Sequence, residues 1–329
     1  MPNPLRRSAE GGLGDGLEGL QFDREGSGLV SELKAGDSVE GYRILAVIGR
    51  GAASIIYLVT DPKSKQVHAL KHVKKHESQD ARFLEQAENE SRVSARLSHP
   101  GLRRVERVIK KSAGIFSGAN ELWLVMDWVD GTSVDRSPPR TPLDAVHVFH
   151  QVAEALAHMH DQGFVHADMK PNNIIVSEDG TAQVIDLGQS CAIGTVKRRI
   201  QGTPDYIAPE QVHRRPITPR TDVYNLGATM YWSLTHRPIP TAMPKDGESL
   251  VSSLDDEMIE RPVPVIDLKP DIEPRLNELI MQCVEVDPEK RPADMRFVAD
   301  RLNLIYAILK ARANDGTRLA DATSNAPGR

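Results

Sequence analysis

The chain has little cysteine, no excess of positive charge and no long apolar run. Only two of its 329 residues are cysteines, Cys191 and Cys283, and they lie far apart without a Cys-x-x-Cys motif or a Cys/His cluster. A disulfide framework and a cysteine-based zinc site are thereby excluded. Because so few cysteines suit a reducing compartment, we expect a cytoplasmic location.

The charge balance argues against two classes of partner. The formal net charge is -5, whereas nucleic acids and anionic lipid surfaces require a basic face. No apolar stretch approaches the ~20 residues that cross a bilayer. The start, MPNPLRRSAEGGLGDG, lacks the apolar segment of a signal peptide. We therefore expect no nucleic-acid partner and no membrane span.

What is present is ordinary for a globular protein. Hydrophobic residues make up 40% and charged residues 26% of the chain, and its length suffices for one large domain or two lobes. Residues 1–36 are expected to form a disordered arm, because they are rich in Gly, Ser and charge and bury little apolar surface. Residues 313–329 are similarly polar and are predicted to be a flexible tail. One domain, 37–312, lies between them.

The spacing of apolar residues changes within this domain. From Tyr42 to Met126 short apolar runs alternate with Gly, Asp-Pro and Lys-Ser, which indicates a sheet with one helix inserted at about residues 80–97. From Leu143 onward apolar residues recur at helical spacing. The sequence thus predicts an α+β fold, with a small β-rich lobe before a larger, mainly helical lobe. Residues 241–267 are expected to be a loop with a short helix.

A glycine-rich turn follows the first strand. Gly49, Gly51 and Ser54 lie between two strand patterns, and glycines let backbone N–H groups approach phosphate oxygens closely. A plain hairpin turn is the alternative interpretation. A dinucleotide-binding turn would need a helix directly after Ser54, and residues 55–59 (IIYLV) are instead typical of a strand.

A lysine and an acidic residue of the inserted helix form a second candidate pair. Lys71 ends the apolar run VHALK, where a surface lysine is the simple interpretation. A carboxylate on the helix that paired with Lys71 would hold its ammonium against the phosphates of a nucleotide. Glu90 is our candidate, and Glu85 and Glu88 are its competitors.

The most specific pattern is FVHADMKPNNIIV, followed ten residues later by DLG. Phosphoryl transfer requires a base, a cation near the transferred group and oxygen ligands for a metal. Four residues in this order have those side chains: Asp168, Lys170, Asn173 and Asp186. Each alone is common in turns, but the ordered set is not.

These motifs resemble the eukaryotic-like serine/threonine protein kinases of bacteria, from about Asp37 to Arg312. VHALK is similar to the family's VAIK, HADMKPNN to HRDLKPxN and DLG to DFG. Further on, GTPDYIAPE, TDVYNLG and CVEVDPEKRP resemble later family motifs. The resemblance implies a bilobal kinase fold, with an N-lobe at about 37–126, a hinge at 127–131 and a C-lobe at 132–312.

The resemblance also implies the cofactors and the site. ATP would bind with Mg²⁺, or with Mn²⁺ as the alternative, and protein serine or threonine hydroxyls would be phosphorylated. Gly49, Gly51 and Ser54 would cover the phosphates, Lys71 would contact them, and Glu90, chosen for its spacing to His99-Pro100, would fix Lys71. Asp168 would be the base, Lys170 the γ-phosphate cation, and Asn173 and Asp186 the metal ligands. The implied adenine pocket consists of Ile56, Ala69, Met126, Asp127 and Val129, although simple strand core is an equal alternative for Met126 and Val129.

Later motifs bear on substrate class and control. A threonine at the position of Thr203 is typical of serine/threonine kinases, in which it braces the residues that correspond to Asp168 and Lys170. Glu210 and Arg291 resemble a buried ion pair of the family. Ala167 stands where the family usually has an arginine that binds a phosphorylated loop. We therefore expect activation without phosphorylation of Thr195. Lys197, Arg198 and Arg199 could replace the missing arginine, but we expect them to stay solvated or to recruit an acidic substrate. Contacts of the arms or dimerisation would then provide the control, and dimerisation itself is left open.

Two other functions fit parts of the pattern. A pseudokinase scaffold would be expected to lack at least one of Lys71, Asp168, Asn173 and Asp186, and all four are present. A small-molecule kinase would share the base loop and a metal aspartate but not GTPDYIAPE or TDVYNLG, which in the family build a platform for a peptide.

Overall fold

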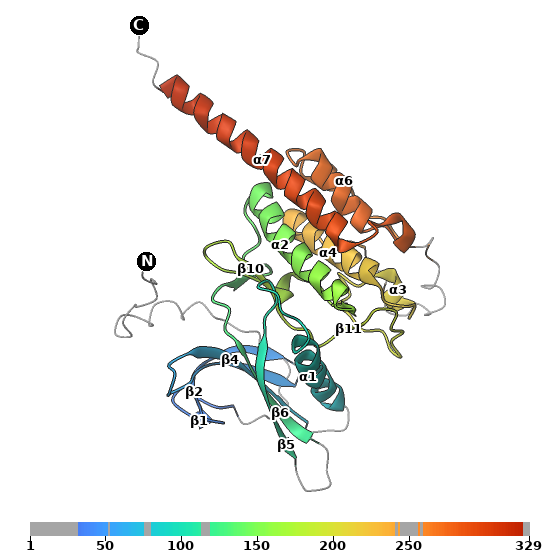
Figure 1. Cartoon of the computed structure of the whole chain (residues 1–329). Helices are drawn as coiled ribbons and strands as arrows, with labels where there is room; N and C mark the ends of the chain where they lie inside the picture. The colour runs from blue at the N-terminus through green and yellow to red at the C-terminus, as the bar shows by residue number, and fades with distance from the viewer. Residues whose placement is uncertain are drawn as a thin grey trace.

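The chain folds into two lobes joined by a short connection (Figure 1). This computed structural model describes residues 32–51, 53–75, 80–112, 119–240, 243, 256 and 259–324, with side chains to 315. Most of the predicted N-terminal arm and of the predicted 241–267 loop lies outside the described residues. Leu33, within the predicted arm, packs against the small lobe.

The small lobe is a six-stranded sheet in the order β1-β2-β3-β4-β6-β5, with all neighbours antiparallel. Side chains alternate between its two faces: Ile55, Tyr57 and Val59 of one strand are buried in the same apolar cluster. Helix α1 packs Leu84 and Ala87 against the other face. The bounds are β1 Ser38–Val39, β2 Tyr42–Gly51, β3 Ser54–Thr60, β4 Val67–Lys74, α1 Ala81–Ser94, β5 Val105–Ser112 and β6 Ala119–Asp127.

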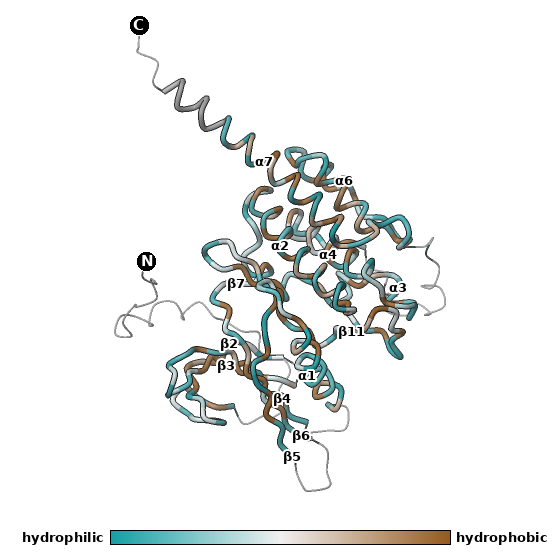
Figure 2. Tube along the Cα trace, viewed as in Figure 1, coloured by the Kyte–Doolittle hydropathy of each residue, from teal (hydrophilic) through white to brown (hydrophobic). Residues whose placement is uncertain are grey.

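The large lobe is a set of helices around the main apolar core. Its first long helix starts at Thr141, whose hydroxyl accepts from the Asp144 N–H, with Pro142 in the first turn. Gly227 allows two helices to meet closely, since a Cβ there would lie 2.6 Å from Cβ of Cys283. The helices are α2 Pro142–Asp161, α3 Pro209–Val212, α4 Pro219–Thr235, α5 Val265–Leu268, α6 Pro274–Cys283 and α7 Met295–Ser324. Figure 2 shows hydrophobic tracts along the sheet strands and the packed helices.

Short strands line the side of the large lobe that faces the small lobe. A three-stranded sheet has the order β10-β9-β7, and β11 pairs with β8. Their bounds are β7 Thr132–Ser133, β8 Phe164–Val165, β9 Ile174–Val176, β10 Ala182–Val184 and β11 Cys191–Ala192, with 3-10 turns at Pro171–Asn173 and Pro288–Lys290. Leu102, on the segment after α1, forms a parallel bridge with Val184. This bridge connects the lobes at a second place besides residues 127–131.

The C-terminal end differs from the sequence prediction. Helix α7 continues to Ser324, where a flexible tail was predicted from residue 313, and Figure 1 shows its end projecting from the large lobe. The physical reason is that an existing helix adds residues at little cost, because nucleation has already occurred in the part packed on α2. Along the residues that the structure describes, no helix has the length and apolar character needed to cross a bilayer.

Candidate active site

The lysine and glutamate of the small lobe form an ion pair between the lobes. Lys71 on β4 places its Nζ 2.7 Å from Oε2 of Glu90 on α1. Glu90 is only 2% exposed, so its charge is compensated inside the protein. Of the two competitors, Glu88 pairs with Lys110 on the surface instead. Among the described residues, no ion pair joins Glu85 to Lys71. The structure thus brings together the pair that the sequence analysis chose.

Asp186 joins this pair from the large lobe. Its Oδ1 lies 3.6 Å from Lys71 Nζ and accepts from the Gly188 N–H at 3.2 Å. Lys71 holds the pKa of Asp186 well below its usual range, against the effect of burial. Burial alone would lower the pKa of Lys71, but Asp186 and Glu90 outweigh it and the pKa rises. Both groups therefore stay charged at neutral pH.

The loop after β8 holds the predicted base. Oδ2 of Asp168 lies 3.1 Å from Lys170 Nζ, and Oδ1 accepts from the Thr203 hydroxyl at 3.0 Å. Lys170 also donates to Thr203 Oγ1 at 2.9 Å. The Asn173 amide nitrogen donates to the Asp168 backbone carbonyl at 2.8 Å. This bond fixes the orientation of the Asn173 side chain and leaves its amide oxygen available as a ligand. Four of the predicted residues therefore form one connected group.

The backbone of this loop is held by a residue that the sequence analysis did not single out. Asp222 on α4 is fully buried and accepts from the N–H groups of His166 and Ala167, each at 2.8 Å. His160 Nε2 lies 2.9 Å from Oδ2 of Asp222. Ala167 has a left-handed backbone (φ 62°). The sequence feature that could have identified Asp222 is its place in the motif TDVYNLG, in the first turn of a helix.

Four of the five predicted adenine residues lie on the inner strands β3, β4 and β6 of the small lobe. Met126 on β6 is fully buried and pairs in register with Ala69 on β4. Ile56 on β3 is opposite Gly49 in the β2-β3 hairpin, where a Cβ on the glycine would lie 3.5 Å from Ile56 Cδ1. Gly51 pairs with Ser54 at the end of the same hairpin, as a turn between two strands. Asp127 is the last residue of β6, and Val129 lies two residues beyond it.

The segment after Asp186 is attached to the large lobe. The Gly194 N–H donates to the Ile217 carbonyl at 2.7 Å, the Ile217 N–H donates to the Thr195 carbonyl at 2.9 Å, and the Thr195 hydroxyl donates to the Ala192 carbonyl at 2.6 Å. Lys197 was predicted to be solvated, but its ammonium donates to the Gln189 carbonyl at 2.7 Å. Burial of this side chain lowers its pKa. Because the Gln189 carbonyl is within reach of its ammonium, the Lys197 side chain turns inward.

Glu210 and Arg291 form a buried pair, as the sequence suggested. Arg291 Nη1 and Nη2 donate to the two carboxylate oxygens at 2.8 and 2.9 Å. Both residues are 3% exposed. Because α3 carries Glu210 and the turn before α7 carries Arg291, the pair fixes the end of the segment against the core.

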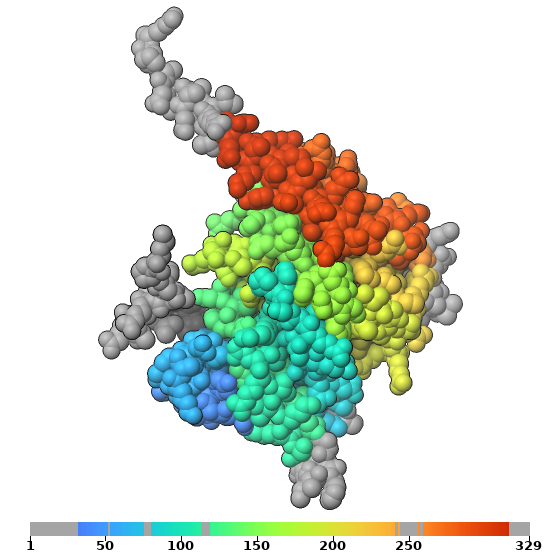
Figure 3. All heavy atoms as spheres, in the orientation of Figure 1, coloured from blue at the N-terminus to red at the C-terminus, as the bar shows by residue number. Residues whose placement is uncertain are grey.

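The comparison with protein families agrees with this geometry. Residues 42–302 match the family described as the protein kinase domain. The chain belongs to this family. Its small curled sheet and larger helical region form the bilobal protein kinase fold (Figures 1 and 3).

Similar curated proteins are serine/threonine kinases of bacteria. The probable serine/threonine-protein kinase PknB of Corynebacterium glutamicum is 30% identical over 271 residues, which cover 79% of this chain and 41% of PknB. PrkC of Bacillus subtilis is 27% identical over 279 residues, 80% of this chain and 41% of PrkC. PknD of Chlamydia pneumoniae is 27% identical over 291 residues, 77% of this chain and 30% of PknD. The chain thus matches less than half of the length of these relatives.

Protein kinases use ATP and a divalent cation, and the residues of this chain fit both. Within the described ranges, no three His, Cys, Asp or Glu side chains gather into a cage for a metal. One carboxylate and one amide, from Asp186 and Asn173, nevertheless suit a hard cation that takes its other ligands from phosphate and water. The ionised state of Asp186 supports this assignment.

Proposed function

We propose that this kinase domain transfers the γ-phosphoryl group of ATP to serine or threonine hydroxyls of protein substrates, with Mg²⁺ as the cation. The observation that carries the proposal is the group of Asp168, Lys170 and Thr203, in which every pair is in contact within 3.1 Å. This arrangement provides a base and a cation side by side, and the contact of Lys71 with Asp186 lies between the two lobes.

Each side chain has a distinct role in this proposal. Asp168 accepts a hydrogen bond from the substrate hydroxyl, orients it and takes its proton, while Lys170 offsets the negative charge on the transferred group. Lys71 contacts the inner phosphates beneath the β2-β3 hairpin, and Glu90 keeps its ammonium in place. When bound at Asn173 and Asp186, Mg²⁺ supplies charge neutralisation on the phosphates.

The same group argues for serine and threonine over other acceptors. Thr203 comes from the segment before α3 and reaches the base directly, so this segment forms one wall of the acceptor site. A small-molecule kinase would not need this wall, and a pseudokinase would not be expected to keep all four of Lys71, Asp168, Asn173 and Asp186. The bacterial relatives are named as serine/threonine kinases. A reducing, ATP-containing cytoplasm suits two free cysteines.

The test is the Asp168→Asn variant with labelled ATP, Mg²⁺ and a generic protein substrate. The amide keeps the shape and still accepts from Thr203, but it takes no proton, so we expect the initial rate to fall at least about 100-fold. Thermal unfolding should stay within about 3 °C of wild type. The control is Asp300→Asn, at an exposed position of α7. Near-normal turnover by Asp168→Asn would sink the assignment of the base, and an inactive wild type would sink the activity itself.

A further inference from the structure

Glu90 is held by two cations, of which the motifs revealed only one. Lys71 Nζ lies on Oε2 at 2.7 Å, and Arg103 Nη2 lies 3.4 Å from Oε1. The Arg103 side chain is only 8% exposed. A guanidinium is always charged and rarely buried without a partner. Its burial beside Glu90 therefore requires an explanation.

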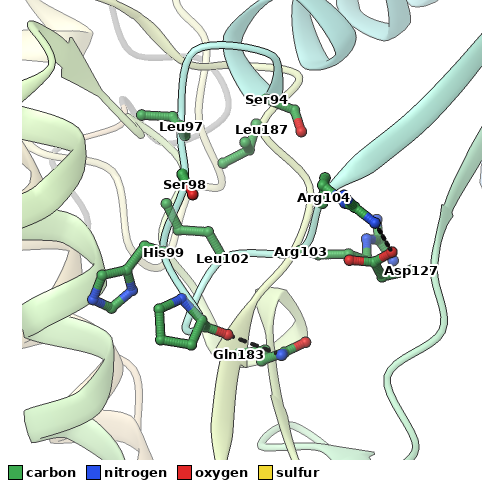
Figure 4. A pocket seen from close by; sticks show the side chains of 11 residues that line it. Ser94, Leu97, Ser98, His99, Leu102, Arg103, Arg104, Asp127, Gln183 and Leu187 are labelled. Carbon is green, nitrogen blue, oxygen red and sulfur yellow. Dashed lines mark hydrogen bonds and ion pairs between the residues drawn. The ribbon is translucent and has the colours of Figure 1, made fainter.

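Arg103 approaches Glu90 from a segment that is anchored on the large lobe. The segment lies between α1 and β5, and Figure 4 shows Leu102 and Arg103 on it with Leu187 nearby. The Val184 N–H donates to the Gly101 carbonyl at 2.8 Å, and the Arg103 N–H donates to the Val184 carbonyl at 3.0 Å. Val184 ends β10, two residues before Asp186. Arg103 thus links the α1 glutamate, which its guanidinium contacts, to β10, which its backbone contacts and which leads to Asp186.

The charges around Glu90 balance only when Arg103 is included. Glu90 and Asp186 are two carboxylates, and Lys71 is close to both, at 2.7 and 3.6 Å. Without Arg103, one ammonium would have to compensate both carboxylates and also contact the phosphates of ATP. Leaving a buried carboxylate incompletely paired is costly. Arg103 therefore keeps Glu90 compensated while Lys71 serves the nucleotide.

Helix α1 has another contact with the large lobe. Asn89 donates from its amide to the carbonyls of Gly188 and Ser190, at 3.0 and 2.7 Å. These bonds are neutral and reach residues after Asp186, so they do not compensate the charge of Glu90. Arg103 provides the charged part of the attachment.

We infer that Arg103 is a positioning residue, which holds Glu90 and with it α1 in the place where Glu90 fixes Lys71. The inference rests on the proposed function, because Lys71 is the group that meets ATP. It adds a residue outside every motif in the sequence, and it means that the inward position of α1 is set from the large lobe as well as from the sheet.

The first test compares Arg103→Met with Arg104→Met. Methionine replaces the unbranched apolar part of the arginine side chain and removes its charge. Arg104, the neighbouring cation, is 64% exposed and pairs with Glu106 and Asp127 on the surface. We expect Arg103→Met to lower kcat/KM for ATP by about tenfold or more and to speed hydrogen exchange of the α1 amides. Arg104→Met should stay within about twofold, and Arg103→Lys should recover part of the loss, because it restores the charge.

The second test asks whether Arg103 acts through Glu90. In a Glu90→Gln background Arg103→Met should change ATP affinity much less than in wild type, because the carboxylate it compensates is gone. An equal change in both backgrounds, or unchanged α1 exchange in Arg103→Met, would overturn the inference. If Arg103→Met does not fold, Arg103→Gln, which also lacks the charge, provides the same comparison. Hydrogen exchange needs no phosphotransfer, so an inactive wild type would refute the proposed function without deciding the role of Arg103.

Discussion

Arg291 shows how much a single buried cation does in this domain. Its guanidinium donates to both oxygens of Glu210 and to the backbone carbonyls of Arg220, Glu285 and Val286. The guanidinium also packs over the ring of Tyr224, with 4.7 Å between its central carbon and the ring centroid. The Arg291 side chain is fully buried, so the residue is part of the core.

We predict that Arg291→Ala lowers the free energy of unfolding by about 3 to 5 kcal/mol, because it leaves the Glu210 carboxylate buried without its partner. Chemical denaturation, followed by circular dichroism, measures the change. The matched control is Arg296→Ala, whose guanidinium is largely exposed and pairs with Asp161, and which should cost less than about 1 kcal/mol. Equal unfolding curves for wild type and Arg291→Ala would contradict the burial of this pair.

At the residue scale, the sequence predicted side chains that belong to ordered motifs and missed those that do not. Asp168, Lys170 and Asn173 lie within a few positions of each other, so their local loop brings them together. Arg103 and Lys197 lie in segments without a motif, and the targets of their side chains are set by tertiary packing. Where two arginines are adjacent, as Arg103 and Arg104 are, the sequence does not indicate which side chain turns inward.

The activation segment, residues 186–210, is the element on which control depends. Ala167 is fully buried and left-handed, and its methyl group offers no partner for a phosphate. The bonds of Gly194 and Thr195 to Ile217, and of Lys197 to Gln189, already attach the first half of the segment. The segment therefore has an ordered position without a phosphate.

We predict that Thr195→Ala and phosphatase-treated wild type keep initial rates within about threefold of untreated wild type at saturating ATP. The physical reason is that no buried cation stands at residue 167 for a phosphate to pair with. Initial rates with the same protein substrate are the measurement. A loss beyond about tenfold, which corresponds to ~1.4 kcal/mol of barrier, would show that phosphorylation matters.

Local sequence patterns predicted which segments are helices and which are strands, but they did not predict where those segments end. The short apolar run at residues 54–60 and the helical spacing after Leu143 predicted β3 and α2 with the right type. The inserted helix was predicted at about 80–97 and is observed at Ala81–Ser94. The continuation of α7 was missed because polarity alone suggested a tail, whereas helix propagation depends on the packed part that precedes it.

For the whole molecule, the important fact is that the site is divided between the lobes. Lys71 and Glu90 belong to the small lobe, while Asp168, Asn173 and Asp186 belong to the large lobe. A ligand that contacts both sets stabilises the folded state as a unit, by about 2.7 kcal/mol when its concentration is 100 times its dissociation constant.

We predict that ATP with Mg²⁺ raises the unfolding temperature more than ATP alone, and that Asp186→Asn removes the Mg²⁺-dependent part of the increase. The amide has no charge for the cation, whereas Lys71 remains to contact the phosphates. Thermal unfolding with ATP, with and without Mg²⁺, provides the measurement, and Asp300→Asn is again the control. An undiminished Mg²⁺ effect in Asp186→Asn would rule out Asp186 as the ligand.

The bridge between Leu102 and Val184 has a mechanical consequence for the two lobes. The chain crosses between them once at residues 127–131, and this bridge with its flanking hydrogen bonds holds them together at another point. Two attachments alone would leave a rotation about the line that joins them, so an opening that keeps the bridge intact has to turn about that line. Such a rotation would stretch the bonds of Asn89 to Gly188 and Ser190 and the contact of Lys71 with Asp186, which lie away from the connection at residues 127–131.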